Sequence, residues 1–165
     1  MKILVLSDSH SALSFMRKCV YRLRPDTVVH LGDHYADGQT LALENPHIPF
    51  HQVTGNCDRY QCFTQQFTVL CYAIGGVRFF MTHGHMHQVK SGIHSLLSAA
   101  GQAQAQAVLY GHTHQADCHR EPDGTWVLNP GSCGGANPSA GLIEIENNQI
   151  TDCRILRQTD LEEML

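Results

Sequence analysis

The sequence has few charged side chains, and their balance does not suit a protein that binds long nucleic acid. Only 16% of the 165 residues are charged, and the formal net charge is −4. Proteins that bind DNA or RNA neutralise many phosphates with clustered Lys and Arg. Five of the eleven basic residues fall within the first 24 positions, but a solvated helix face explains that cluster. Long nucleic acid is therefore a poor candidate ligand.

Long apolar runs are also absent. No stretch approaches the roughly 18 apolar residues that a membrane span needs. The apolar run Met1–Leu6 is too short for a signal peptide and is followed by no small-residue cleavage site. We therefore expect no membrane partner. No repeat, low-complexity segment or linker divides the chain, so we expect a single domain over residues 1–165.

The cysteines show no pairing pattern. There are seven, an odd number, and no two of them form a Cys-x-x-Cys motif. A disulfide framework or a thiolate zinc site would be expected to show even numbers or close pairs. Neither is indicated, and reduced thiols in the cytoplasm fit this composition best.

Histidine, in contrast, is abundant, with 12 residues in a chain that has little other charge. This points to metal or proton chemistry. Elsewhere, short buried runs typical of strands alternate with helical periodicity, which favours parallel pairing and an α/β fold. The expected strands cover residues 3–6, 27–31, 50–54, 67–74, 77–82 and 107–110 with further strands in the C-terminal third, and the expected helices cover 13–23, 38–43 and 88–105.

Five of the expected strands end in clusters of Asp, His and Asn. These clusters are Asp8-Ser9-His10, Gly32-Asp33, Gly55-Asn56, His83-Gly84-His85 and Gly111-His112-Thr113-His114. Open α/β sheets bind ligands at the carboxyl ends of their strands, so the clusters can converge. Within Asp8-x-His10 and His112-x-His114, an extended backbone would send both side chains to the same side, so each pair could bind one site.

The candidate ligands are carboxylates, imidazoles and an amide, with no thiolate. Such a set suits Mn²⁺, Fe, Ni²⁺, Co²⁺ or Zn²⁺. Seven ligands are too many for one ion, but they suit two ions that share a carboxylate. Two metals about 3.5–4 Å apart are the arrangement that stabilises attacking and leaving oxygens in phosphoryl transfer.

In order and position, these five motifs resemble those of the calcineurin-like metallophosphoesterases, in particular the small bacterial and archaeal phosphodiesterases. The resemblance covers nearly the whole chain. It implies a four-layer αββα sandwich of two mixed β-sheets flanked by helices. It also implies hydrolysis of small phosphodiesters by a bridging water or hydroxide, with two divalent ions, manganese being the first expectation. One ion would be held by Asp8, His10, Asp33 and His114, and the second by Asp33, Asn56, His83 and His112.

The chain departs from the usual family pattern after the third motif. Most members have a His after the Asn, taken as a proton donor or transition-state stabiliser, whereas this chain has Cys57. A thiol is a poorer donor than an imidazolium, so we expect good leaving groups such as aryl oxides to be favoured. Cys57 itself is expected to be a packing residue and not a nucleophile. Asn56 and Asp58 are the candidate catalytic residues, with Asp58 orienting Asn56 or the backbone of the site.

Several residues beside the motifs are not assigned as ligands. The family often has an Asp three residues after the bridging Asp, but Asp37 comes four after Asp33, so we assign it no role. His34, His85 and His87 lie beside motifs and could contact a substrate phosphate, although structural roles are favoured for each. The segment 129–135 (Asn-Pro-Gly-Ser-Cys-Gly-Gly) could bind a phosphate through its amides or form a plain turn.

Two other functions compete with phosphodiester hydrolysis. A phosphomonoesterase or phosphoprotein phosphatase would ordinarily need the missing His and cationic groups, and Arg59 is the only Arg beside a motif. A non-catalytic interaction scaffold is the second alternative, since this fold also serves in membrane-trafficking complexes. Such scaffolds have lost several ligands, and the retention of all seven favours catalysis. The strand edges leave room for a homo-oligomer.

Overall fold

A strand, helix, strand unit opens the chain, as predicted. The computed structural model describes residues 1–58 and 67–164. Strands β1 (Lys2–Leu6) and β2 (Thr27–His30) are fully parallel neighbours, and helix α1 (Leu13–Leu23) connects them. The helix ends where Arg24 adopts a left-handed conformation, one residue before Pro25. Ile3–Leu6 of β1 is buried and continuously apolar, whereas β2 is buried throughout but has the polar residues Thr27 and His30 at its two ends.

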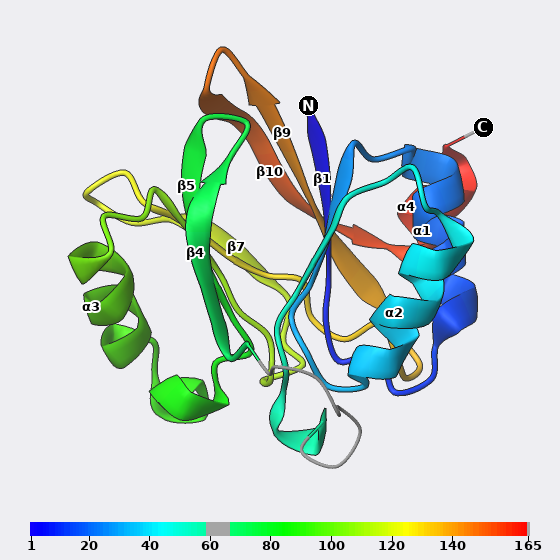
Figure 1. Cartoon of the computed structure of the whole chain (residues 1–165), viewed down its shortest axis with the longest axis horizontal. Coiled ribbons are helices and arrows are strands. Elements are labelled where there is room, and N and C mark those ends of the chain that lie inside the picture. Colours follow the sequence, from blue (N-terminus) through cyan, green and yellow to red (C-terminus); the bar gives the residue numbers. More distant parts are fainter. Residues whose placement is uncertain (59–66, 165) are drawn as a thin grey trace.

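The first sheet has the strand order β10-β9-β1-β2-β3. Strand β3 (Phe50–Gln52) continues the parallel set, whereas β9 (Ser139–Glu146) and β10 (Gln149–Arg157) are antiparallel to their neighbours. Helices α1, α2 (Tyr35–Glu44) and α4 (Gln158–Glu163) lie together on its outer face (Figure 1). The apolar faces of these helices pack on side chains such as Leu4 and Leu142.

The second sheet has the order β4-β5-β6-β8-β7. Its first two strands form the predicted hairpin around Gly75-Gly76, and β5, β6 and β8 are parallel. Helix α3 (His94–Gln102) covers the outer face of this sheet (Figure 1). The strands are β4 (Val69–Ile74), β5 (Val77–Thr82), β6 (Ala107–Leu109), β7 (Asp117–Arg120) and β8 (Trp126–Asn129).

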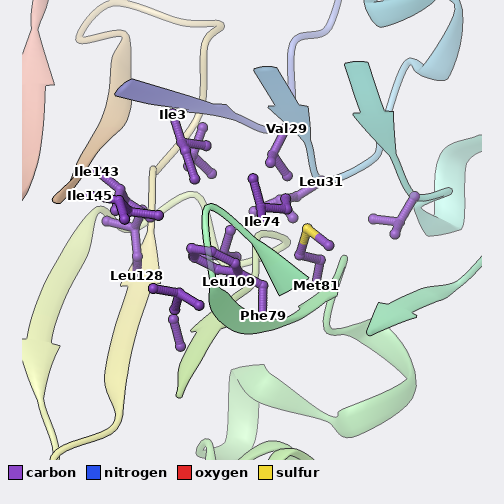
Figure 2. Close-up of a cluster of buried hydrophobic side chains, with 14 residues drawn as sticks. Ile3, Val29, Leu31, Ile74, Phe79, Met81, Leu109, Leu128, Ile143 and Ile145 are labelled. Atoms are coloured by element: carbon purple, nitrogen blue, oxygen red, sulfur yellow. The ribbon is translucent and has the colours of Figure 1, made fainter. Parts of the chain in front are cut away.

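The main core lies between the two sheets. Figure 2 shows Ile3 and Val29 of the first sheet pointing toward Phe79, Leu109 and Leu128 of the second. These side chains are at most 1% exposed, so the two sheets bury one continuous apolar layer. At about 25 cal/mol per Å² of apolar area, this layer is a major source of folding free energy. The architecture is the predicted four-layer αββα sandwich.

Two elements differ from the sequence prediction. The helix expected over residues 88–105 is shorter, because two 3₁₀ turns (His85–His87 and Val89–Ser91) and Gly92, with φ of 130°, come before α3. Helix α4 was not predicted, because six residues carry too little periodicity. The helix is stabilised by the burial of Leu161 and by the Asp160 carboxylate, which accepts a hydrogen bond from the Arg157 amide. Among the described helices, none has the length and apolar character to cross a bilayer.

Candidate metal centre

The candidate ligands follow the carboxyl ends of β1, β2, β3, β5 and β6, and the structure brings these ends together. The Asp8 amide donates to the Gly32 carbonyl at 3.0 Å, which joins the turns after β1 and β2. The imidazole of His83, after β5, donates from Nδ1 to the Leu31 carbonyl at 2.7 Å, which joins the two sheets. The predicted convergence of the motifs is therefore present in the fold.

One group of ligand atoms comes from Asp8, His10 and His114, whose candidate ligand atoms all lie within 4.8 Å of one another. His114 Nε2 lies 3.0 Å from Asp8 Oδ1. Their orientation does not form a hydrogen bond, and no described residue donates one to this buried oxygen. A buried carboxylate oxygen without a donor is unfavourable unless a cation balances it.

A second group comes from Asp8, Asp33 and His83, again with candidate ligand atoms within 4.8 Å of one another. His83 Nε2 lies 3.2 Å from Asn56 Oδ1 and 3.5 Å from Asp33 Oδ1. The His112 ring lies beside His83, with 5.0 Å between their centroids. Because His83 Nδ1 donates to Leu31, its Nε2 carries a lone pair when the ring is neutral, so three lone pairs face one another.

These distances fit bound divalent metal. Two ligands of one ion at about 2.1 Å are separated by about 3.0–3.4 Å in octahedral or tetrahedral geometry. The closest pairs here are 3.0, 3.2 and 3.5 Å apart. The set contains carboxylates, imidazoles and an amide oxygen, which suit first-row divalent ions. Asp8 belongs to both groups, whereas the sequence pattern placed it with one ion only.

The backbone at the ligands is not extended, and the sequence expectation about it was wrong. Asp8, His10, Asp33, His112 and His114 all have φ between 43° and 69°, in the left-handed region. The chain turns sharply as it leaves each strand, so residues two apart need not point to the same side. Asp8 and His10 still belong to one group of candidate ligands, as expected, but His112 and His114 are separated. His114 therefore lies beside Asp8, while His112 lies beside His83. The pair His112-x-His114 is divided between the two groups.

Two glycines allow the strand ends to approach closely. A Cβ atom on Gly111 would lie 2.1 Å from Ser7 Oγ and 2.8 Å from Asp8 Oδ2. A Cβ atom on Gly55 would lie 2.1 Å from Asp33 Oδ1. Real Cβ contacts are not this short, so any side chain at either position would displace a candidate ligand.

Asp58 binds the backbone of the site. Its Oδ2 accepts hydrogen bonds from the amides of Asp33 and Gly55 at 3.0 and 2.7 Å, and its Oδ1 accepts one from Tyr35 at 2.8 Å. These bonds join the turns after β2 and β3. Asp58 thus orients the backbone, which is one of the two roles expected for it, and it is fully buried.

Asp37 has a structural role that the sequence did not reveal. Its Oδ2 accepts hydrogen bonds from Ser9 Oγ at 2.7 Å and from the Ser11 amide at 2.8 Å. Both donors flank His10, so Asp37 fixes the turn that carries this ligand. The signal was missed because its position departs from the family spacing. Nearby, Nε2 of the buried His30 lies 3.3 Å from Ser9 Oγ, and burial lowers the pKa of His30 to about 4.

Cys57 is exposed and its backbone amide donates to Asp33 Oδ1 at 2.9 Å. Desolvation and the neighbouring Asp33 carboxylate raise the pKa of Cys57 to about 11. The thiol is therefore protonated at neutral pH and a weak nucleophile, but its exposure contradicts the expectation that it is a packing residue. Burial opposes ionisation of Asp33, but the Cys57 hydrogen bond and His83 lower the pKa of Asp33 overall.

The side chains of the turn at 129–132 form hydrogen bonds with the turns that carry the candidate ligands. Asn129 Nδ2 donates to the Gly111 carbonyl at 3.2 Å and to Thr113 Oγ1 at 2.9 Å. Ser132 Oγ donates to the Asp8 carbonyl at 2.8 Å. These side chains fix the turns on both sides of the candidate centre. The sequence left open whether this segment binds a phosphate through its amides or forms a plain turn. Its contacts are those of a structural turn.

The flanking histidines lie near the ligands. The ring of His34 lies 4.9 Å from that of His10, and the ring of His85 lies 5.4 Å from that of His83, measured between centroids. His87 packs edge-on against Phe80.

The pKa of His112 is lowered by burial, by His83 and by the positive charge of Lys90. Arg59 lies outside the described residues.

Known proteins resemble this chain over most of its length. The phosphodiesterase MJ0936 of Methanocaldococcus jannaschii is 28% identical over 172 residues, covering 90% of this chain and 96% of the relative. The probable metallophosphoesterase YsnB of Bacillus subtilis is 30% identical over 157 residues, covering 92% and 88%. A crystal structure of Vps29 from Entamoeba histolytica complexed with Zn²⁺ shares the fold, with a TM-score of 0.68, 19% identity, and coverage of 95% and 98%.

The family model for the calcineurin-like phosphoesterase superfamily domain matches residues 1–148. This match includes all five strand-end motifs and extends into β9 and the turn after it. The chain therefore belongs to the calcineurin-like phosphoesterase superfamily, a class of hydrolases.

Proposed function

We propose that this protein is a phosphodiesterase that uses two divalent metal ions to hydrolyse small phosphodiesters. The observation that carries the proposal is that His83 Nε2, Asn56 Oδ1 and Asp33 Oδ1 lie close together with their lone pairs facing one another. The nearby Asp8 Oδ1 is buried and accepts no hydrogen bond from a described residue. A bound cation would stabilise such a cluster of electron-rich atoms. The phosphodiesterase name of the archaeal relative supports the choice of ester.

The residues that would hold the metals are those predicted. Asp8, His10 and His114 would form one site, and His83, Asn56 and His112 the other, with Asp33 between them. Divalent ions in these sites would polarise the phosphoryl oxygens and lower the pKa of a bound water. We propose manganese as the first candidate metal.

The chain's own residues would set the geometry and the proton balance. Asp58 and Asp37 hold the turns that carry Asp33 and His10, so the ligands do not need to reorganise during the reaction. Cys57, next to Asp33, brings no positive charge to the leaving oxygen. Esters whose leaving group needs little protonation would therefore react fastest.

The net charge of −4 favours a small substrate over long nucleic acid. A phosphomonoester carries a second negative charge, for which a site with an imidazolium and several cations would be better suited. We therefore place diesters ahead of monoesters. We also propose that the protein works in the cytoplasm, because its seven cysteines show no disulfide framework.

The test compares bis-p-nitrophenyl phosphate with p-nitrophenyl phosphate, using chelator-stripped protein with and without Mn²⁺. We expect metal-dependent turnover of the diester, and two bound metals per chain by elemental analysis. Asp33→Asn is the matched control, because it keeps the side-chain shape but removes the shared charge, and it should lose both metal and turnover.

A lack of turnover for both esters with every first-row metal, in folded protein, would overturn the proposal. It would favour the scaffold alternative, which the fold shared with Vps29 makes the second candidate. Turnover of the monoester alone would instead identify a phosphatase.

A further inference from the structure

Two cysteines far apart in sequence lie in contact at one side of the sandwich. Cys118 is on β7 and Cys153 is on β10, and these are edge strands of different sheets. Their Sγ atoms are 3.0 Å apart, and Cys118 Sγ lies 3.2 Å from the Cys153 carbonyl oxygen. Cα atoms of the two strands approach within 8 Å. The backbones are therefore near the range that a disulfide spans, roughly 4.4–6.8 Å between Cα atoms.

Both thiols lie at the rim of the core between the sheets and remain partly accessible. They pack against the buried inter-sheet cluster, but neither is fully enclosed. Neither strand carries a candidate metal ligand, so this site is separate from the metal centre.

The chemistry of the pair differs from that of the buried cysteines. Burial raises the pKa of Cys19, and raises that of Cys133 to about 12, so both are inert at neutral pH. Cys118 Sγ donates to Cys153 Sγ, and this side-chain hydrogen bond lowers the pKa of Cys118. The same interaction and burial raise the pKa of Cys153. Cys118 is thus suited to attack an external disulfide first, and Cys153 is suited to attack the resulting mixed disulfide second.

We propose that Cys118 and Cys153 form a redox-reactive dithiol site that small disulfides oxidise to an intramolecular disulfide joining the two sheets. The Cys118 thiolate attacks one sulfur of the small disulfide, forms a mixed disulfide and releases one small thiolate. Cys153 then attacks Cys118 Sγ, closes the Cys118–Cys153 bond and releases the second small thiolate. The two protein thiols lose two electrons and two protons, and the small disulfide is reduced to two thiols.

The closed form should be more stable than the open form. The link spans 35 residues of sequence, and it would restrict the unfolded chain. It would also join β7 to β10 by a covalent bond. We expect oxidation to raise the midpoint of thermal unfolding by about 5–10 °C.

The experiment treats the full-length chain with oxidised glutathione, blocks the remaining thiols with N-ethylmaleimide and maps the products by mass spectrometry. Wild type should lose two free thiols without retaining glutathione, and should yield a peptide pair linked through Cys118 and Cys153. Dithiothreitol should reverse both the link and the rise in the unfolding midpoint.

Variants at two positions make the result specific. Cys153→Ser should trap one glutathione on Cys118 and show no rise in the unfolding midpoint, and Cys153→Ala serves if the serine variant does not fold. Cys71→Ser, at another partly exposed cysteine, should behave as wild type. Stable glutathione on Cys118 in wild type, links between other cysteines, or no oxidation would each overturn the proposal. Hydrolytic activity plays no part in this test.

Discussion

The carboxylate of Asp58 holds the backbone of Asp33 through a 3.0 Å hydrogen bond from the Asp33 amide. The same carboxylate holds Gly55 and Tyr35, so one buried side chain fixes the turns after two neighbouring strands. The position of the proposed shared ligand therefore depends on a residue that does not itself face the metals.

Asp58→Asn tests this dependence. An amide can accept through one oxygen only, and its NH₂ group would face a backbone donor. We expect metal affinity and diester turnover to fall about 10–100-fold, and the free energy of unfolding to fall by about 1–3 kcal/mol. Isothermal titration with Mn²⁺ and urea unfolding would measure the two effects. A variant with wild-type metal affinity would show that Asp58 is not a positioning residue.

Gly111→Ala should disturb the site directly. The added methyl group would overlap Ser7 Oγ and press on Asp8 Oδ2, which also accepts the His112 amide. We expect at least a tenfold loss of metal affinity. Gly101→Ala is the matched control: it lies in α3 with nothing within 4 Å of the new Cβ, and should be neutral or stabilise the helix by up to about 1 kcal/mol. Equal metal affinity in the two variants would contradict the proposed position of Asp8.

Cys57→His should change the preference for leaving groups. The new imidazole would stand next to Asp33 and could donate a proton, which the thiol, with a pKa raised to about 11 by desolvation and Asp33, does poorly. We expect the ratio of alkyl to aryl diester turnover to rise at least tenfold. Cys57→Ser, which adds no imidazole, controls for the loss of the thiol. Equal rates of wild type on matched alkyl and aryl diesters would refute the assumed lack of a strong proton donor.

His30 should make stability fall in mild acid. Burial lowers its pKa from 6.5 to about 4, so between these values the unfolded chain binds a proton that the folded chain does not. The free energy of unfolding therefore falls as the pH falls through this window, by about 2 kcal/mol at pH 5. Urea unfolding of metal-free wild type and His30→Gln at pH 7.5 and 5.0 would isolate this contribution. The same pH dependence in both proteins would exclude it.

The sequence predicted the strands and the convergence of the motifs because both follow from burial. Ile3–Leu6 is apolar throughout and β2 has the buried pair Val28 and Val29 at its centre, and the polar clusters that follow the two strands lie at the sheet edge. The burial of Leu161 in α4 and the hydrogen bonds of Asp37 depend on tertiary contacts that no local pattern encodes. Likewise, the contact between Cys118 and Cys153 requires the relative position of two sheets, which cysteine spacing does not reveal.

The left-handed turns at the ligands have a consequence for the order of folding. Non-glycine residues disfavour this conformation, so the turns at Asp8, Asp33 and His114 gain little from local preference and depend on the completed sandwich. We expect them to form last, after the sheets have paired. In the metal-free protein, amide hydrogens of these turns should exchange with solvent before those of β1 and β5, and added metal should slow their exchange most.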